Sequence, residues 1–228
     1  MQRIGLLFIV GLLISQLTYG RDYTDRQFAM FDIEFSISKD FREEMEAIED
    51  YIDGLADFQN RTKDALKSAL IHHMYYYMEE RLEREVELDL LPVNTFLNEV
   101  KYDDYGYPRS SVREALRVGY SDYYIKVDFK LESITGKQRE VNPELFEGID
   151  YAVTMPQMTI DITVYNDEGI IPVDNWTGVA AANAPIPITN DFLKGYDGRE
   201  VEINPEAQKD EKLYLLFDRA ISHMINKI

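Results

Sequence analysis

Strict alternation of apolar and polar residues marks several stretches of the chain. It runs over residues 28–37, 123–131 and 158–164, and the polar tetrapeptide 166–169 then reverses the chain toward a further strand near 170–181. Successive side chains of a strand point to opposite faces of a sheet, so this pattern is typical of half-buried strands. The last two strands, joined by so short a turn, are expected to form a β-hairpin.

Apolar residues at spacings of three and four predict helices between these strands. One helix is expected over about 41–55 and a second over about 62–84, after which alternation over 86–90 predicts a short strand that Pro92 closes. The expected buried stripe of the second helix consists of Leu66, Ala69, Leu70, His73 and Tyr77.

Two further helices carry end signals. Ser111 and Glu114 form a capping-box pattern, and Gly119 can end that short helix in the left-handed conformation. After a loop over 183–204, Pro205 suits the first turn of a final helix. The apolar face of that helix comprises Leu213, Leu216, Phe217, Ala220, Met224 and Ile228.

The order of these elements is strand, two helices, strand, helix, strand, hairpin and helix. Helices between the early strands imply crossover connections, whereas the later strands are joined directly. We therefore expect an α/β fold of α+β-like character, in which a mixed β-sheet of about five strands carries packed helices, including a carboxy-terminal one, in a single domain.

The first twenty residues have the pattern of a secretory signal peptide. Arg3 is followed by an apolar run over 4–14, and Thr18 and Gly20 place small residues at the −3 and −1 positions of a cleavage site. The apolar run is shorter than the roughly 20 residues that a spanning helix needs. We expect cleavage near Gly20, which leaves one exported domain over 21–228 in the periplasm or outside the cell. A retained membrane anchor is the alternative.

Composition argues against several partners and chemistries. The 228 residues include 24 Lys and Arg against 42 Asp and Glu, a formal charge of −18, which disfavours nucleic acid and anionic membrane surfaces as partners. With Cys 0, the chain has no disulfide, thiolate nucleophile or lipidated amino-terminal cysteine. An exported protein of this size without disulfides fits a bacterial periplasm, although sequons at Asn60 and Asn175 leave a eukaryotic secretory route open.

The residues that most often bind metals or perform catalysis are few. Adjacent His72 and His73 point about 100° apart on a helix and cannot share one ion, and His223 has no acidic or histidine partner four residues away. We expect no metal site and no cofactor, with His73 facing the core and His72 facing outward. The acidic run 79–85 is typical of a solvated helix face, and no nucleophile-elbow or phosphate-loop glycine motif occurs.

Tyrosine is the strongest candidate for binding chemistry. The chain has Tyr 16, with clusters at 75–77, 102–107 and 120–124. A tyrosine ring offers a large apolar surface and one polar tip, which suits a ligand cleft or a protein interface; packing at the core margin is the structural alternative. The loop 101–108 is rich in Asp and Gly and is expected to lie on the surface. The candidate binding residues are Tyr102, Tyr105, Tyr107, Tyr123 and Tyr124.

A helix leads into the segment GYSDYYIKV at 119–127, and a hairpin over 158–176 ends at Trp176. This passage, residues 111–176, resembles small periplasmic assembly modules: the curli-secretion lipoproteins, the amino-terminal domain of the TolB translocation protein, and outer-membrane lipoprotein activators of cell-wall synthases. The resemblance implies an α/β domain with a mixed sheet, a packed carboxy-terminal helix and a non-catalytic role in envelope assembly or transport. The chain departs from the lipoprotein members because no cysteine follows the signal peptide.

Together these features predict an exported, non-enzymatic envelope protein that binds another protein during assembly or transport. The alternatives are a small-ligand carrier with a tyrosine-lined cleft and a carboxylate-dependent hydrolase. An envelope protein is the expected partner, and a second copy of the chain is left open. A deep closed pocket at the tyrosines would favour the carrier, a flat aromatic patch the protein interface, and convergent buried carboxylates the hydrolase.

Overall fold

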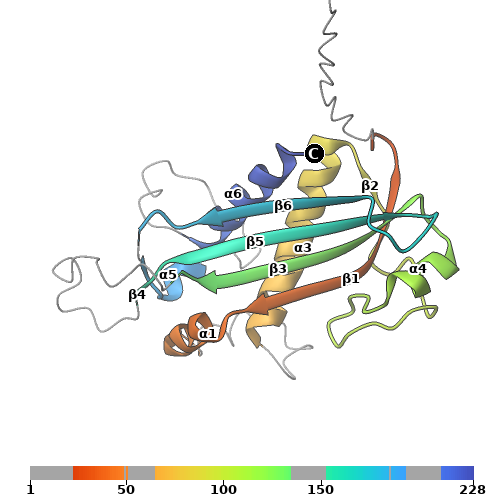
Figure 1. Cartoon of the computed structure of the whole chain (residues 1–228). Helices are drawn as coiled ribbons and strands as arrows, with labels where there is room; N and C mark the ends of the chain where they lie inside the picture. The colour runs from red at the N-terminus through yellow and green to blue at the C-terminus, as the bar shows by residue number, and fades with distance from the viewer. Residues whose placement is uncertain (1–22, 49, 51–64, 135–152, 185, 194–211) are drawn as a thin grey trace, which may run out of the picture.

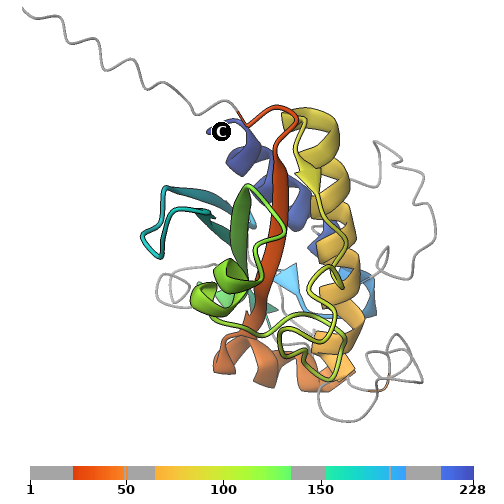
Figure 2. The ribbon, with the colours of Figure 1, turned by 90° about the vertical axis from the view of Figure 1, so that its right-hand side faces the viewer.

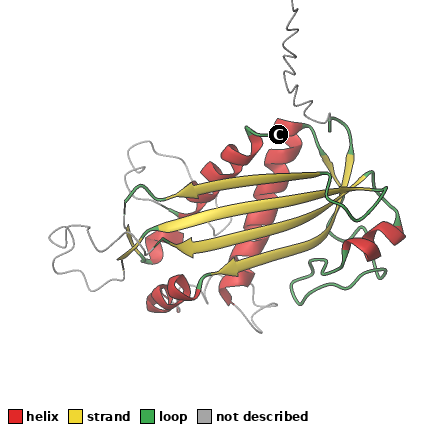
Figure 3. Ribbon diagram, viewed as in Figure 1, coloured by secondary structure: helices red, strands yellow, loops and turns green. Residues whose placement is uncertain are grey.

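The computed structural model describes residues 23–48, 50, 65–134, 153–184, 186–193 and 212–228. Its centre is a five-stranded sheet in the order β2-β1-β3-β5-β6, seen face-on in Figures 1 and 3. The long strands are β1 (Gln27–Ile37), β3 (Tyr123–Ser133) and β5 (Pro156–Asn166). The edges are β6 (Asp174–Ala181) and the two-residue β2 (Asp89–Leu90).

The sheet is mixed, which confirms the predicted fold class. β1 pairs in parallel with β2 and β3, whereas β3, β5 and β6 pair antiparallel. β5 and β6 form the expected hairpin, although β6 begins at Asp174 and Ile171 in the connecting turn is 78% exposed. A second, two-stranded sheet joins β4 (Val153–Thr154) to β7 (Ile186–Pro187).

The helices follow the predicted order. α1 (Lys39–Met45) and η1 (Glu46–Ile48) occupy the start of the first expected helix, and α4 (Val112–Val118) has the predicted capping box and a left-handed Gly119. The remaining helices are α3 (Ala65–Val86), α5 (Asn190–Leu193) and α6 (Leu213–Ile225). The expected signal peptide, the end of the first helix and Pro205 lie outside the described residues.

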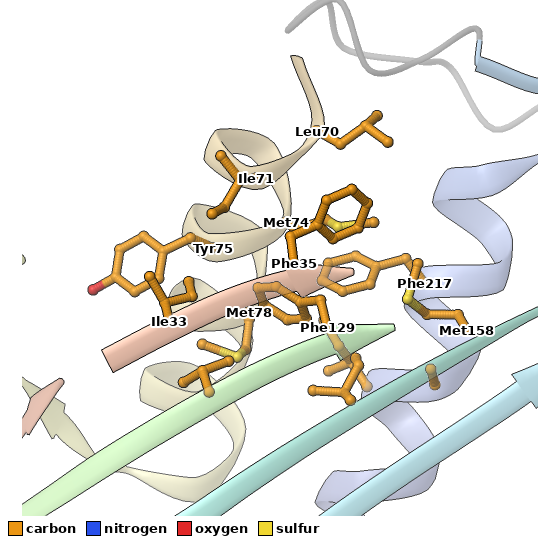
Figure 4. Close-up of a cluster of buried hydrophobic side chains, with 14 of the residues drawn as sticks. Ile33, Phe35, Leu70, Ile71, Met74, Tyr75, Met78, Phe129, Met158 and Phe217 are labelled. Carbon is orange, nitrogen blue, oxygen red and sulfur yellow. The ribbon is translucent and has the colours of Figure 1, made fainter. Parts of the chain in front are cut away.

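The main core lies between the sheet and two helices. α3 and α6 cross behind the strands in Figure 1, and Figure 4 shows Ile33, Phe35 and Phe129 of the sheet pointing toward Met74 of α3 and Phe217 of α6. All five side chains are at most 8% exposed. Burying such side chains is the main source of stability in a domain of this size.

Arg81 connects α3 to α6 beside this core. Its side chain is 9% exposed and forms ion pairs with Glu85 of α3 and Asp218 of α6. The guanidinium also donates to Ser222 Oγ at 3.0 Å and Tyr77 Oη at 3.2 Å. The guanidinium nitrogens therefore all have hydrogen-bond acceptors, as burial of a cation requires.

A smaller apolar cluster lies on the opposite face, beneath α4. Figure 2 shows α3 on one side of β1 and α4 on the other. Phe31 lies in this cluster with Tyr124 and Phe96. The pairing of β1 with β3 shifts register between Met30 and Asp32, so Phe31 is the extra residue of a β-bulge. After the bulge, Ile33 and not Asp32 returns to the main core.

α6 lies against the edge strand β6 at very short distance. A Cβ atom on Gly178 would stand 2.0 Å from the backbone oxygen of Ala220 and 2.9 Å from Cβ of Met224. Only a residue without a side chain allows this approach.

Three polar side chains from the end of the chain also bond the outer edge of β6. The pairs are Arg219 Nη2 to Ala181 O at 3.0 Å, Val179 N–H to His223 Nδ1 at 3.0 Å, and Lys227 Nζ to Thr177 O at 3.1 Å. Four helical residues rise about 6 Å and two strand residues about 6.6 Å, so the two spacings match. We call these three contacts the edge ladder.

Two local predictions about α3 were wrong. The helix continues to Val86 where a strand was expected, and Glu87 then leaves it with a φ of 60°, so the strand shrinks to β2. The buried stripe also differs, since Tyr77 is 38% exposed and His73 is half-buried. Leu70 is buried as predicted, and the side chains of Leu66 and Ala69 lie outside the part of the chain that the structure describes. Among the described side chains of α3, the buried ones are Leu70, Ile71, Met74, Tyr75, Met78, Arg81 and Leu82.

Candidate functional site

Two of the five candidate tyrosines begin β3 and point to opposite faces of the sheet. Tyr123 stacks on Phe28, with ring centroids 5.0 Å apart, next to Tyr23. Tyr124 is fully buried beneath α4, and its hydroxyl accepts from the backbone N–H of Ser121 at 3.3 Å. Both rings pack against other side chains of the chain. Their role in binding stays a prediction.

The other three candidates lie in the loop between β2 and α4, and here the expected surface exposure was wrong for one of them. Tyr107 is only 4% exposed. Its ring meets that of Tyr75 edge to face at 5.7 Å, beneath α3. Tyr102 and Tyr105 are half-buried, and Tyr102 packs on the α4 cluster. The composition of the loop suits a turn, but the turn directs Tyr107 inward.

Asp103 determines the shape of this loop. Its Oδ1 atom accepts the backbone N–H groups of Tyr105 at 2.9 Å and Tyr107 at 3.0 Å. Its own N–H donates to the Tyr107 carbonyl at 2.8 Å, and its carbonyl accepts from Gly106 at 3.1 Å. Such side-chain bonds to the backbone are what make Asp a turn residue. The loop is therefore preorganised by its own hydrogen bonds.

The loop is also attached to α3. The ammonium of Lys67 lies 5.3 Å from the centroid of the Tyr105 ring and 3.9 Å from Asp103 Oδ2. Both contacts favour a positive charge at this place. Further along, the backbone N–H of Ser110 donates to the Phe31 carbonyl of β1 at 3.1 Å. The segment thus runs from α3 past β1 to α4, as Figure 2 shows.

A pocket of about 460 Å³ opens between α3 and this loop. Its size is in the range of small-ligand and side-chain sites, about 300–1,000 Å³. Two of the candidate residues, Tyr105 and Tyr107, line it, whereas Tyr102, Tyr123 and Tyr124 are not among the described lining residues. The described lining residues are His72, Tyr76, Glu79, Leu90, Pro92, Val93, Asn94, Tyr105, Gly106 and Tyr107. We call this site the α3 pocket.

α3 contributes His72, Tyr76 and Glu79 to the pocket, which sequence reasoning did not single out as binding residues. Their spacing of four and three residues places them on one helix face, and the rings of His72 and Tyr76 are 4.5 Å apart. That spacing was the available signal. The three residues differ in type, so the spacing does not form a motif of one residue class.

Polar atoms at the pocket are linked to one another. The Tyr107 hydroxyl lies 3.4 Å from His72 Nδ1, and the Tyr75 hydroxyl donates to Glu79 Oε1 at 2.9 Å. Burial raises the pKa of the Glu79 carboxyl, an effect that the Tyr75 hydrogen bond partly offsets. Burial likewise raises the pKa of the Tyr107 phenol, so both tyrosines are neutral phenols at physiological pH.

The open face of the sheet carries a second group of ionisable residues. Lys126 Nζ lies 3.6 Å from Asp32, 3.5 Å from Glu34 and 3.3 Å from Asp128, and Arg109 donates to Glu34 at 2.6 Å. Burial raises the pKa of Asp32 and of Asp128, while the Arg109 hydrogen bond lowers that of Glu34. Each carboxylate has a cationic partner, as in a structural ion-pair network.

The histidines lie apart from any cluster of ligands. His72 is exposed at the pocket, His73 is half-buried, and their ring centroids are 6.0 Å apart; His223 belongs to the edge ladder. Among the described residues, no three His, Asp or Glu side chains are arranged to hold a metal ion. The same residues include no helix that combines the length and apolarity needed to cross a membrane.

No family model matches the chain, and no curated protein matches it. Among the solved structures that are similar to it are two bacterial proteins. The hypothetical protein CT253 from Chlamydia trachomatis aligns over 90% of this chain and 95% of its own, with a TM-score of 0.41 and 8% sequence identity. XCC0632 from Xanthomonas campestris, of the DUF330 family model, aligns over 90% of this chain and 82% of its own, with a TM-score of 0.31 and 10% identity.

These two neighbours are bacterial proteins whose names assign no activity. Neither is named as one of the periplasmic assembly modules that residues 111–176 resemble. That resemblance stays a prediction from the sequence.

Proposed function

We propose that this chain is an exported, non-enzymatic protein of a bacterial envelope that binds a partner protein through the α3 pocket. The observation that supports the proposal best is the combination of an open, aromatic-lined pocket with a wall that its own hydrogen bonds hold in place. A preorganised wall lowers the entropy cost of binding. Tyrosine-rich surfaces of this kind are common where proteins recognise one another.

The exported location rests on the amino-terminal pattern. Residues 1–20 combine a basic start, a short apolar run and small residues before the cleavage site. The negative charge and the lack of cysteine fit a protein that works in an aqueous, exported compartment without disulfides.

Two tyrosines of nearly equal exposure allow a matched test of the pocket. Tyr76 lines the pocket and is 49% exposed, while Tyr120 follows α4 and is 50% exposed. We would compare Tyr76→Ser and Tyr120→Ser for thermal unfolding and for co-purification of partners from envelope extract of the source cells. Loss of an interface anchor commonly costs about 2 kcal/mol or more, roughly thirtyfold in affinity.

The proposal expects Tyr76→Ser to lose a co-purifying protein that both the wild type and Tyr120→Ser retain, at unchanged melting temperature. Equal capture by all three proteins would refute a role for the pocket in partner binding. Equal loss in both variants would show that the captured protein binds through general stickiness of exposed rings.

The volume of the pocket favours one second candidate, a small-ligand carrier. A site of about 460 Å³ holds a small organic molecule as well as a side chain. Mass spectrometry of the protein under non-denaturing conditions separates the two functions. A carrier retains a stoichiometric organic molecule that Tyr76→Ser loses, whereas a partner-binding protein is recovered without one.

A further inference from the structure

We infer that the α3 pocket binds the cationic end of a basic side chain, an arginine or a lysine, that the partner protein presents. This inference rests on the proposed function and names the chemistry of the partner. Three features of the pocket support it: the rings in its walls, the charge of its one ionised carboxylate, and the apolar residues that line the rest of it.

Aromatic rings line the pocket from two directions. His72 and Tyr76 come from α3, and Tyr105 and Tyr107 come from the loop. An aromatic ring attracts a cation over its face through its quadrupole, and several rings around one cavity form the arrangement that recognises ammonium and guanidinium groups. The loop already binds one such group, because Lys67 lies 5.3 Å from the centroid of the Tyr105 ring. Lys67 itself is not among the described lining residues.

The charge of the pocket points the same way. Glu79 is the one carboxylate among the described lining residues. The described residues offer it a hydrogen bond from Tyr75 but no cationic partner within ion-pair distance. Burial raises its pKa, and the nearby Glu83 raises it further. A cation that enters the pocket would supply the partner charge that Glu79 lacks.

The carboxylates on the open face of the sheet differ from Glu79, because they have cationic partners. There, Asp32, Glu34 and Asp128 share the cations Lys126 and Arg109 at 2.6–3.6 Å. Those carboxylates already have cationic partners, so they need no cation from a ligand. Glu79 is half-buried at the α3 pocket and has no such cation among the residues that the structure describes.

The remaining lining residues suit the stem of a basic side chain. Leu90, Pro92 and Val93 line the same pocket, and methylene groups of lysine and arginine pack on apolar surfaces of this kind while the charged head is held elsewhere. An anionic ligand would face Glu79 and a chain of charge −18, which disfavours it. A neutral apolar ligand would bury Glu79 without a counter-charge.

A pair of capped peptides tests the charge of the ligand directly. The probes are acetyl-Gly-Arg-Gly-amide and the same peptide with citrulline, which keeps the shape of arginine but is neutral. Binding is measured by amide chemical-shift titration of the purified, labelled protein, with shifts expected at 105–107. We expect the arginine peptide to bind at least about tenfold more tightly than the citrulline peptide, since a charge-assisted contact is worth that much or more.

Two variants of the protein test the carboxylate with matched changes of charge. Glu79→Gln keeps an oxygen that accepts from Tyr75, whereas Glu80→Gln removes a neighbouring carboxylate that is 65% exposed and pairs with Arg84. Glu79→Gln is expected to weaken the arginine peptide about tenfold or more, and Glu80→Gln less than about twofold. Thermal unfolding of both variants confirms that they remain folded.

Two results would overturn the inference. These are equal affinity for the arginine and citrulline peptides, and equal weakening of the arginine peptide by Glu79→Gln and Glu80→Gln. If Tyr76→Ser still loses its partner while arginine and citrulline bind alike, the partner-binding function stands and only the choice of a cation fails.

Discussion

The contact between Gly178 and α6 supports a quantitative prediction about stability. Gly178 lies on the inner face of β6, directly opposite Ile160 of β5. A Cβ atom at this position would stand 2.0 Å from the Ala220 oxygen, and ordinary van der Waals contact begins at 3.4 Å. Because the obstacle is a backbone carbonyl, no side-chain rotation relieves the overlap. Gly178→Ala therefore requires the whole of α6 to move away from the sheet.

That movement has a calculable consequence. The gap must widen from 2.0 Å to at least 3.4 Å, which separates Leu216, Ala220 and Met224, each 0% exposed, from the strands they pack on. Overpacking a well-filled core costs about 1–3 kcal/mol, and a rigid obstacle places this case near the upper end. For a domain of this size, about 3 kcal/mol lowers the melting temperature by about 6–12 °C.

Urea unfolding followed by the fluorescence of the single tryptophan, Trp176, measures the effect. Trp176 is 3% exposed and lies two residues from Gly178 on the same face of β6. Gly169→Ala is the matched control, since a Cβ there meets nothing within 4 Å, and its effect should stay within about 0.5 kcal/mol. If Gly178→Ala lies within about 1 kcal/mol of the wild type, α6 does not approach β6 as described.

Three other predictions follow from contacts and patterns described above. Arg81→Met should lower the free energy of unfolding by about 2–3 kcal/mol, because it removes the ion pair to Asp218 and the hydrogen bond to Ser222 that join α3 to α6. Arg84→Met, at a side chain 57% exposed, should change it by under about 0.5 kcal/mol; equal effects would contradict the interhelical role of Arg81. Arg109 lowers the pKa of Glu34 from its ordinary value of 4.5, so the stability that Glu34 contributes is present above that value and is lost as pH falls through the lower folded pKa. Glu34→Gln should therefore lower the free energy of unfolding more at pH 7 than at pH 3, and a larger loss at pH 3 would contradict the lowered pKa. Amino-terminal sequencing of the exported protein should begin near Arg21, and an intact Met1 on cytoplasmic material would refute export.

Local signals in the sequence predicted most of the fold. The alternation in β1, β3 and β5 arises because each strand has one face on the main core, and the capping box of α4 depends on Ser111 and Glu114 alone. Where the prediction failed, the structure depends on contacts between distant parts of the chain or on the conformation of a single residue. Alternation over 86–90 imitates a strand, yet Val86 still belongs to α3, and Glu87 breaks the pattern with a positive φ.

The candidate site was half predicted for the same reason. Asp and Gly in the loop indicate a turn, but which tyrosine the turn directs inward depends on bonds from Asp103 and on the position of α3. α3 has apolar or aromatic residues on more than one side, because it packs on both the sheet and α6. Sequence alone therefore cannot show whether the buried face of α3 contains Tyr77 or Tyr75. The pocket depends on this, because the face that is buried determines which residues of α3 line the pocket.

The edge ladder has a consequence for the order of events during synthesis. β6 ends at Ala181, and the residues that the structure describes as bonding its outer edge, those of the edge ladder, lie beyond residue 212. A nascent or translocating chain thus exposes a complete hairpin with an uncovered edge before α6 emerges to cover it. Uncovered strand edges template pairing with other chains. Fragments that stop between 182 and 212 should therefore aggregate, and a holding chaperone would be needed for that interval and no longer.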